Sequence, residues 1–367
     1  MDSAESAGGR LGAVLTAPRS GVVALGPSGP WLTTTPSQAR QVLTDTARFD
    51  FPGDVSRSGD LSASRGETRS GHLLFAPVTP DQVARGLATF THEWQSALDD
   101  HDRLSPGTPY DAMVLLRRPV ARSTTVAVLT AASDAQRDVV ADQVLDWIDA
   151  LAPVIAARRP PHRWSRARRA ERDARLTLED TLTAIPELEA SPAQVATMLA
   201  AGIQVPIAAG SWLLAWLAHR PCPGVDPVHA VWETLRLTPP TWITARITTA
   251  EVEIDGQHLP SGAVVMVSPL LLGRLPALVA GDPAHLRDFD PDRWREGAQR
   301  PGAWLPFGAG PHACPGRALG MAQLVHLAQW CSAHEMTLSE SVTIDQSRGI
   351  APLPCRFDVS ARKEPPA

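Results

Sequence analysis

Residues 304 to 320 read WLPFGAGPHACPGRALG, and this short stretch decides how the rest of the chain is interpreted. It sets one cysteine, Cys314, among glycines and prolines, directly before an apolar segment that is typical of a helix. A helix that begins just after a cysteine supplies partial positive charge and unpaired N–H groups, which stabilise a thiolate. The glycines permit a loop that bends tightly around the sulfur and approaches a flat cofactor. Taken alone, such a loop is weak evidence, and a buried structural cysteine in a turn is the favoured interpretation.

The composition of the 367 residues is that of an ordinary globular protein, with 44% hydrophobic and 20% charged residues. The length leaves one large domain or two modest ones open. The formal net charge of -5 gives no reason to expect a nucleic-acid partner. The N-terminus has acidic residues before a short apolar stretch, so we expect no secretory signal and a cytoplasmic protein.

The cysteines point to a reducing compartment. They form no CxxC pair and have no regular spacing, which argues against a disulfide framework or a zinc site. The four are Cys222, Cys314, Cys331 and Cys355.

The hydrophobic pattern predicts a mainly α protein with a small antiparallel β region. Residues 20–50 have the pattern of a hairpin followed by a helix, and residues 78–220 have apolar positions at helical spacing. A further helix is predicted at 226–237 and a final one at about 315–334. Between these helices, hydrophobic and polar residues alternate with a period of two, as in β-strands, around Asp255-Gly256, a pair favoured in tight hairpins.

One segment, residues 195–218, contains no formal charge and is long enough to cross a membrane. Gln204, Pro206 and Ser211 lie near its middle, and no other segment of the chain resembles it. We therefore predict a long buried helix rather than a membrane helix.

The spacing F-G-x-G-x-H-x-C-x-G resembles the haem-binding signature of the cytochrome P450 family. Here it consists of Phe307, Gly308, Gly310, His312, Cys314 and Gly316. In that family the matching cysteine is the axial thiolate ligand of haem iron, the phenylalanine packs beside the sulfur, and the histidine position donates to a haem propionate. The resemblance thus implies haem b as cofactor, with Cys314 as the metal ligand. Thiolate ligation favours O–O cleavage, which suits oxygen activation.

Further motifs agree with this resemblance. Glu233 and Arg236 in ETLRLTPP stand three apart on a helix, as in the family's E-x-x-R motif. Arg293 in FDPDRW matches the third member of the same buried charge triad, which braces the cysteine loop and is structural. Arg246 in TWITARITT resembles the arginine that reaches a haem propionate, with a solvated arginine as the alternative.

The upstream resemblance is looser. Aligning on FAPVTP places His72 where it would donate to a propionate, and a surface histidine is the alternative. The chain is also short for the family, because the connection between 216 and 231 is abbreviated. We expect one P450-like haem domain over residues 16–360, with loose ends at 1–15 and 361–367.

The uncharged helix departs from the family. Its usual A-G-x-(Asp or Glu)-Thr line, where an acid and an alcohol supply protons to dioxygen, reads here Ala201, Gly202, Ile203, Gln204, Val205. An amide does not titrate usefully and valine has no hydroxyl, so neither Gln204 nor Val205 replaces the pair. Pro206 removes a backbone N–H and should kink the helix, leaving carbonyls that could hold water.

The resemblance implies a monooxygenase acting on a small molecule of specialised metabolism, with electrons from a separate ferredoxin and ferredoxin reductase. The atypical helix leaves two alternatives open: a peroxide-driven or non-oxygen haem-thiolate enzyme (rearrangement, dehydration or desaturation), and a non-catalytic helper protein. The arginine cluster at 158–175 is interpreted as a solvated helix face. Its alternative role is to steer an anionic substrate, a carrier protein or an acidic electron donor.

Overall fold

A computed structural model describes residues 4, 6–27, 29–51, 75–157, 161–188, 190–276, 279, 285–295, 304–346 and 349–361. Apart from Met1, the chain divides into two compact units. The helical unit comprises Pro77–Thr234 and Gly316–Ala367, and the sheet unit comprises Asp2–Ala76 and Leu235–Pro315. Each unit combines separated segments, because the chain passes through both of them more than once.

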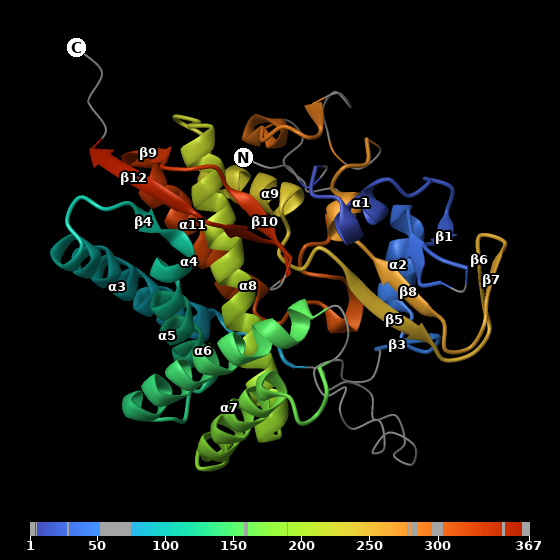
Figure 1. Ribbon diagram of the computed structural model, residues 1–367, viewed down its shortest axis with the longest axis horizontal. Helices are drawn as coiled ribbons and strands as arrows, with labels where there is room; N and C mark the ends of the chain where they lie inside the picture. The colour runs from blue at the N-terminus through green and yellow to red at the C-terminus, as the bar shows by residue number, and fades with distance from the viewer. Residues whose placement is uncertain are drawn as a thin grey trace. The chain divides into compact units, whose positions relative to one another are not determined.

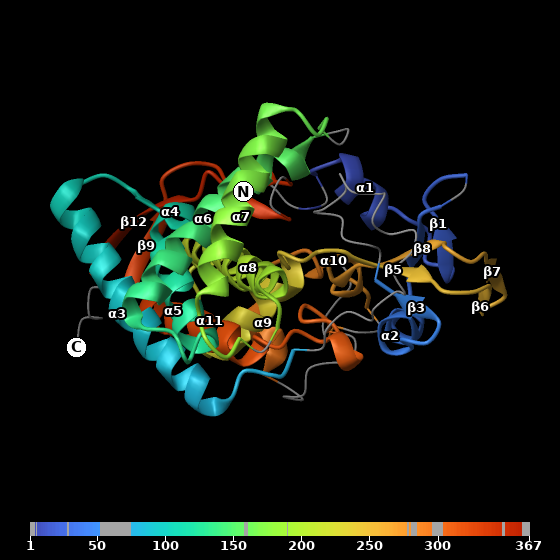
Figure 2. The same ribbon diagram turned by 90° about the horizontal axis from the view of Figure 1, so that it is seen from below.

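The helical unit is built around the long helix α8 (Pro192–His219), seen in Figure 1. This helix has no charged side chain before His219. The longer helices that pack against it are α5 (Arg117–Val128), α6 (Asp134–Ala156), α7 (Arg166–Thr183) and α11 (Arg317–Ser332). A fifth long helix, α3 (Pro80–Leu104), packs against α5 and α11, and Figure 2 shows this group from a second side. The unit also contains α4 (Ala112–Leu115) and most of α9 (Pro227–Leu237).

Local sequence signals begin the long helices. Each of α3, α6 and α8 starts with a capping box, in which a Ser or Thr side chain and a glutamine three residues later satisfy each other's backbone N–H groups. The pairs are Thr79 with Gln82, Ser133 with Gln136, and Ser191 with Gln194.

The uncharged helix α8 is a core helix, as its sequence predicts. It is long and apolar enough to cross a membrane, but 61% of its most apolar 18-residue window is buried inside the protein. Every residue from Ile207 to Ala218 is buried. The indole N–H of Trp212 donates to the carbonyl of Ile350 at 3.1 Å, so even the polar atom of this buried ring has a protein partner.

Two small antiparallel sheets complete the helical unit. One has the order β4-β12-β9, and Tyr110 of β4 lies opposite Phe357 of β12. The other pairs β10 with β11. Their bounds are β4 (Tyr110–Asp111), β9 (His334–Leu338), β10 (Thr343–Asp345), β11 (Ala351–Leu353) and β12 (Arg356–Ala361).

The sheet unit contains a five-stranded sheet in the order β1-β2-β8-β5-β3. Neighbouring strands are antiparallel except β2 and β8, which are parallel. Their bounds are β1 (Val22–Ala24), β2 (Trp31–Thr33), β3 (Phe49–Asp50), β5 (Thr244–Thr248) and β8 (Val264–Val267). The unit also holds the short helices α10 (Pro269–Leu272), η3 (Pro291–Trp294) and η4 (Gly310–His312).

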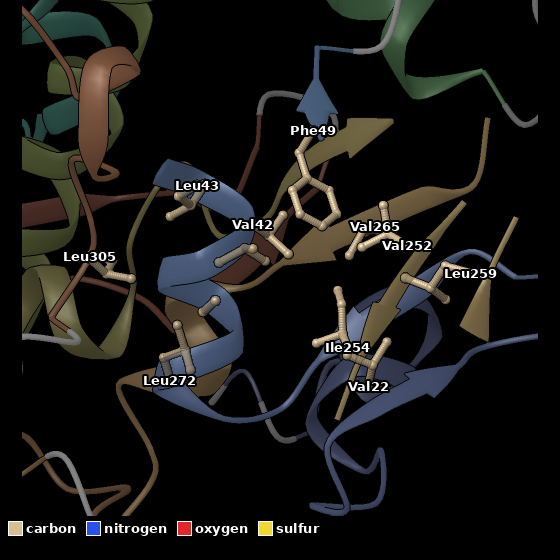
Figure 3. Packing of buried hydrophobic residues seen from close by; sticks show 12 residues of the cluster. Val22, Val42, Leu43, Phe49, Val252, Ile254, Leu259, Val265, Leu272 and Leu305 are labelled. Carbon is tan, nitrogen blue, oxygen red and sulfur yellow. The ribbon is translucent and has the colours of Figure 1, made fainter. Parts of the chain in front are cut away.

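Helix α2 (Pro36–Thr44) lies over this sheet, and apolar side chains fill the space between them (Figure 3). Val42 and Leu43 of the helix, Phe49 of β3 and Val265 of β8 belong to the same buried cluster. The hairpin of β6 (Val252–Ile254) and β7 (Gln257–Leu259) adds Val252, Ile254 and Leu259. Its turn residues Asp255 and Gly256 have φ of 48° and 75°, which confirms the tight hairpin predicted from the Asp-Gly pair.

The first fifteen residues differ from the expected loose end. They contain α1 (Gly9–Leu15), in which Leu11 and Val14 are buried. A helix of two turns with two buried positions has too short a pattern to be distinguished in the sequence from irregular chain. At the other end, β12 continues to Ala361.

Candidate functional site

The cysteine loop of the sheet unit is a chain of tight turns that fixes the backbone of Cys314. The N–H of Cys314 donates to the carbonyl of Phe307 at 2.8 Å, and the N–H of Gly308 donates to Leu305 at 3.0 Å. Cys314 is exposed and lies three residues before the first residue of α11. The Phe307 ring meets the edge of Trp304, with ring centroids 6.0 Å apart. The loop thus holds an accessible thiol on a constrained backbone.

Two glycines of the loop adopt left-handed conformations, Gly308 with φ of 70° and Gly310 with φ of 71°. At Gly310 a Cβ atom would lie 3.0 Å from both the Leu43 carbonyl oxygen and the Thr44 Cα, at the end of α2. Glycine is therefore needed there for close approach to another backbone as well as for its conformation. At Gly308 a Cβ would meet nothing nearer than 3.8 Å, so this part of the loop is open.

The other cysteines differ from Cys314 in their surroundings. All four are thiols rather than disulfides, and Cys331 and Cys355 are buried. Burial raises the pKa of both buried thiols well above the usual range, which disfavours the thiolate that binds metals.

The two predicted propionate donors, Arg246 and His312, contact the same aromatic ring. The Arg246 guanidinium carbon lies 3.7 Å from the centroid of the Phe51 ring. The His312 ring meets Phe51 edge-on, with centroids 4.7 Å apart and an interplanar angle of 88°. No local pattern in the sequence identifies Phe51, because its contacts join segments about 195 and 261 positions apart along the chain. The structure therefore gathers the anion-binding candidates of the sheet unit at one place.

Arg246 is a buried cation suited to an anionic ligand. Its side chain donates to the Thr244 hydroxyl at 3.3 Å and to the Ala245 carbonyl at 2.9 Å, and the residue is 4% exposed. Burial lowers its pKa to about 10, and the negative charge of Asp50 opposes this shift. Among the described residues no carboxylate lies within ion-pair distance of it. A carboxylate such as a haem propionate would supply the missing counter-charge, so these residues fit a haem.

The residues of the predicted charge triad are deeply buried. Glu233 and Arg236, one turn apart on α9, are 0% and 1% exposed. Arg236 donates to three carbonyl groups of the sheet unit, those of Gly273 at 3.0 Å, Leu286 at 2.7 Å and Asp288 at 3.1 Å.

Arg293 reaches the same segment. Its side chain is 2% exposed and donates to the carbonyls of His285 at 3.2 Å and Asp288 at 3.4 Å. Arg236 and Arg293 therefore meet at the Asp288 carbonyl and fix the chain ahead of the cysteine loop.

The atypical segment of α8 lies in the helical unit. Ala201 is exposed, whereas Gly202, Gln204 and Val205 are half-buried. Both polar atoms of the Gln204 amide are buried, and neither has a hydrogen-bond partner among the described residues. An unsatisfied buried amide is unfavourable, so a polar ligand group would stabilise this position.

Helix α8 continues through Pro206 without a break. Pro206 has no backbone N–H to donate to the carbonyl of Gly202, four residues earlier. This carbonyl accepts a hydrogen bond from the Thr124 hydroxyl of α5 at 3.4 Å. The sequence predicts that Pro206 leaves carbonyls without their helical donor, free to hold water. One of these carbonyls instead accepts a hydrogen bond from a hydroxyl group of a neighbouring helix.

The remaining predicted positions are less informative. His72 and residues 158–160 of the arginine cluster lie outside the described residues. On α7, Arg166, Arg169 and Arg172 are exposed, in agreement with a solvated helix face. Glu171, which lies within the cluster at 158–175, does not share this exposure: it is 4% exposed and accepts a hydrogen bond from the Trp147 indole at 3.1 Å.

Three comparisons with known proteins bear on this arrangement. The family model described as Cytochrome P450 matches residues 228–340, which include α9 and the cysteine loop. Cyclooctatin synthase of Streptomyces melanosporofaciens is 34% identical over 159 residues, 35% of this chain and 33% of that protein. Cyclooctat-9-en-7-ol 5-monooxygenase of the same organism is 42% identical over 94 residues, 25% of this chain and 20% of that protein. The matched regions thus span between a fifth and a third of these relatives' length.

Solved structures show the same fold over nearly the whole chain. Cytochrome P450SP alpha has a TM-score of 0.69 at 18% identity, with 91% of both chains covered. A six-coordinated cytochrome P450 from Thermus thermophilus has a TM-score of 0.65 at 19% identity, covering 91% of this chain and 92% of that one. The family model over residues 228–340, the curated relatives and the solved structures are all cytochrome P450s, and the chain has the cytochrome P450 fold.

Proposed function

We propose that the chain is a haem-thiolate monooxygenase in which Cys314 binds the haem iron and Arg246 and His312 bind the haem carboxylates. The observation that carries this proposal is the convergence of Arg246 and His312 on one ring in the unit that also holds the cysteine loop. The buried guanidinium of Arg246 has no carboxylate partner in the described part of the chain, so an anionic ligand would stabilise it. The exposed thiol of Cys314 lies on a constrained backbone, which suits a metal ligand.

Each residue has a distinct task in this proposal. The backbone hydrogen bond from Cys314 to Phe307 holds the thiolate in a fixed direction. Arg236 and Arg293 prevent movement of the chain before the loop. Arg246 and His312 orient the cofactor through its two carboxylates. Haem held by a thiolate supplies oxygen activation when it is bound.

The substrate class and partners are proposed from the relatives. One relative is named cyclooctatin synthase and another cyclooctat-9-en-7-ol 5-monooxygenase, which supports a small molecule of specialised metabolism as substrate. Electron supply by a ferredoxin and its reductase, and a cytoplasmic location, are the expectations that accompany this family. The exposed arginines of α7 are a candidate surface for an acidic donor or carrier protein.

A second candidate function rests on α8. The amide of Gln204 does not titrate and Val205 has no hydroxyl, so positions 204 and 205 supply neither an acid nor an alcohol. The Gly202 carbonyl is already bonded by Thr124. These observations favour a peroxide-driven enzyme, which takes both its oxidant and its protons from hydrogen peroxide, or one that catalyses rearrangement or dehydration, which need neither. Desaturation belongs to the peroxide-driven case, because the removal of two hydrogens needs an oxidant.

The test compares the two oxidant systems on a substrate without a polar group near the reacting carbon. For the peroxide-driven candidate, ferredoxin-driven turnover should release most electrons as hydrogen peroxide, and added peroxide should form product at least as well. The double variant Gln204→Asp, Val205→Thr should then improve coupling, since one proton donor typically changes a rate about 10²- to 10⁴-fold. Tight coupling in the unaltered protein, with no gain in the variant, would favour the ordinary monooxygenase. The matched control is Gln143→Asp on α6, which also changes a glutamine with a buried, unpartnered oxygen and should leave coupling unchanged.

A further inference from the structure

Phe51 occupies its place because of strand pairing. In the antiparallel pair of β3 and β5, Phe49 lies opposite Thr248 and Asp50 opposite Ile247. Continuing this register by one residue places Phe51 directly opposite Arg246. Residues opposite each other in antiparallel strands have side chains close enough to interact, which accounts for the guanidinium lying 3.7 Å from the ring centroid.

The contact with His312 comes from a different part of the sheet unit. His312 ends the short helix η4, and the close approach of Gly310 to the end of α2 fixes where that helix lies. The His312 ring then meets Phe51 at 88°. One ring therefore limits the movement of two side chains that come from independent segments.

Phe51 contributes less to the apolar core than its neighbour two positions earlier. Phe49 is 1% exposed and belongs to the buried cluster under α2, whereas Phe51 is half-buried. The face of an aromatic ring attracts a cation and does not bind an anion. Phe51 can thus keep Arg246 in place without competing for its ligand.

We propose that Phe51 is a positioning residue that holds Arg246 and His312 together as a receptor for the carboxylates of haem. The inference rests on the proposed function, in which these two residues bind the propionates. Phe51 itself makes no contact with the carboxylates in this account. Removing its ring should weaken the binding of charged carboxylates specifically and leave the binding of an uncharged porphyrin unchanged.

The experiment uses the full chain loaded either with haem or with haem dimethyl ester, whose two carboxylates are blocked and uncharged. The rate of porphyrin transfer to excess apomyoglobin is measured for the unaltered protein, Phe51→Leu and Phe51→Trp. The unaltered protein should retain haem longer than the ester. Phe51→Leu should reduce this preference about twofold to thirtyfold, the range expected for loss of a cation–π contact. Phe51→Trp keeps an aromatic face and should retain the preference.

A double-mutant cycle with Arg246→Gln separates positioning from packing. Because Phe51 holds both Arg246 and His312, Phe51→Leu should reduce the preference less in the Arg246→Gln background than in the unaltered protein, and an equal reduction in both backgrounds would overturn the inference. Equal acceleration of haem and ester loss by Phe51→Leu would overturn the inference, because a ring that only fills space affects both porphyrins alike. An unchanged preference would also overturn it while leaving the proposed function intact, provided that the carbon monoxide spectrum still reports a thiolate. Absence of a thiolate spectrum in the unaltered protein would overturn both.

Discussion

Replacing Arg236 by methionine should destabilise the folded chain strongly. Methionine fills much of the same space but donates no hydrogen bond. Three carbonyls, those of Gly273, Leu286 and Asp288, lose a charged donor at 2.7 to 3.1 Å. Hydrogen bonds to charged groups contribute about 1.5–3 kcal/mol each, so the loss should be at least about 4 kcal/mol.

The loss can be measured as the urea midpoint of tryptophan fluorescence, with haem retention as a second readout. Because the whole stability of a domain is only about 5–15 kcal/mol, Arg236→Met could fail to accumulate. Arg236→Lys keeps the charge but cannot reach all three carbonyls, so it should lose less and remain measurable. The matched control is Arg295→Met, which removes an exposed arginine paired with Asp292 at 3.0 Å and should change stability by less than about 1 kcal/mol.

Equal urea midpoints for Arg236→Met and Arg295→Met would refute this reasoning. They would mean that the segment carrying these carbonyls is held by other contacts and that the buried arginine is not its brace. A midpoint lowered only by Arg236→Met and Arg236→Lys would support the brace, since the two sites differ chiefly in burial and in the number of carbonyls they serve.

Two further predictions concern the helical unit. Tyr110 is the chain's only tyrosine, and its hydroxyl donates a hydrogen bond to the Asp102 carboxylate. Burial and this carboxylate together raise the pKa of Tyr110 to about 12. The absorbance of Tyr110 at 295 nm should therefore titrate near pH 12, and Asp102→Asn should lower this midpoint. Because the pKa of Tyr110 is raised in the folded state, the tyrosine's contribution to folding stability is present below pH 10 and is lost as the pH rises through 12. Thr124→Val should lower the free energy of unfolding in urea by roughly 1 kcal/mol, because the Gly202 carbonyl loses its hydrogen-bond donor. The loss should be smaller when Pro206→Ala restores the missing N–H, and equal losses in both backgrounds would contradict the pairing.

The cysteine loop and the long helices could be predicted from the sequence because their signals are local. The spacing around Cys314 identifies the turns, and the lack of charge between residues 195 and 218 identifies the core helix. The Asp255-Gly256 pair likewise specifies its hairpin, since only a few turn types accept that pair.

The partners of these elements could not be predicted, because they depend on contacts between distant segments. The contact of Phe51 with Arg246 follows from the register of β3 on β5, which no local pattern encodes. The hydroxyl of Thr124 looks like any other in a helix until α5 packs against α8. The need for glycine at Gly310 was predicted, but its closest neighbour is the end of α2, which only the folded chain reveals.

The most direct test of the central claim is the carbon monoxide spectrum of the reduced, haem-loaded protein. If Cys314 is the iron ligand, the unaltered protein should give the strongly red-shifted Soret band of a thiolate complex. The single variants Cys222→Ser, Cys331→Ser and Cys355→Ser should keep that band, and Cys314→Ser should lose it. A band at the position of histidine-ligated haem in the unaltered protein, or a red-shifted band that survives Cys314→Ser, would contradict the account.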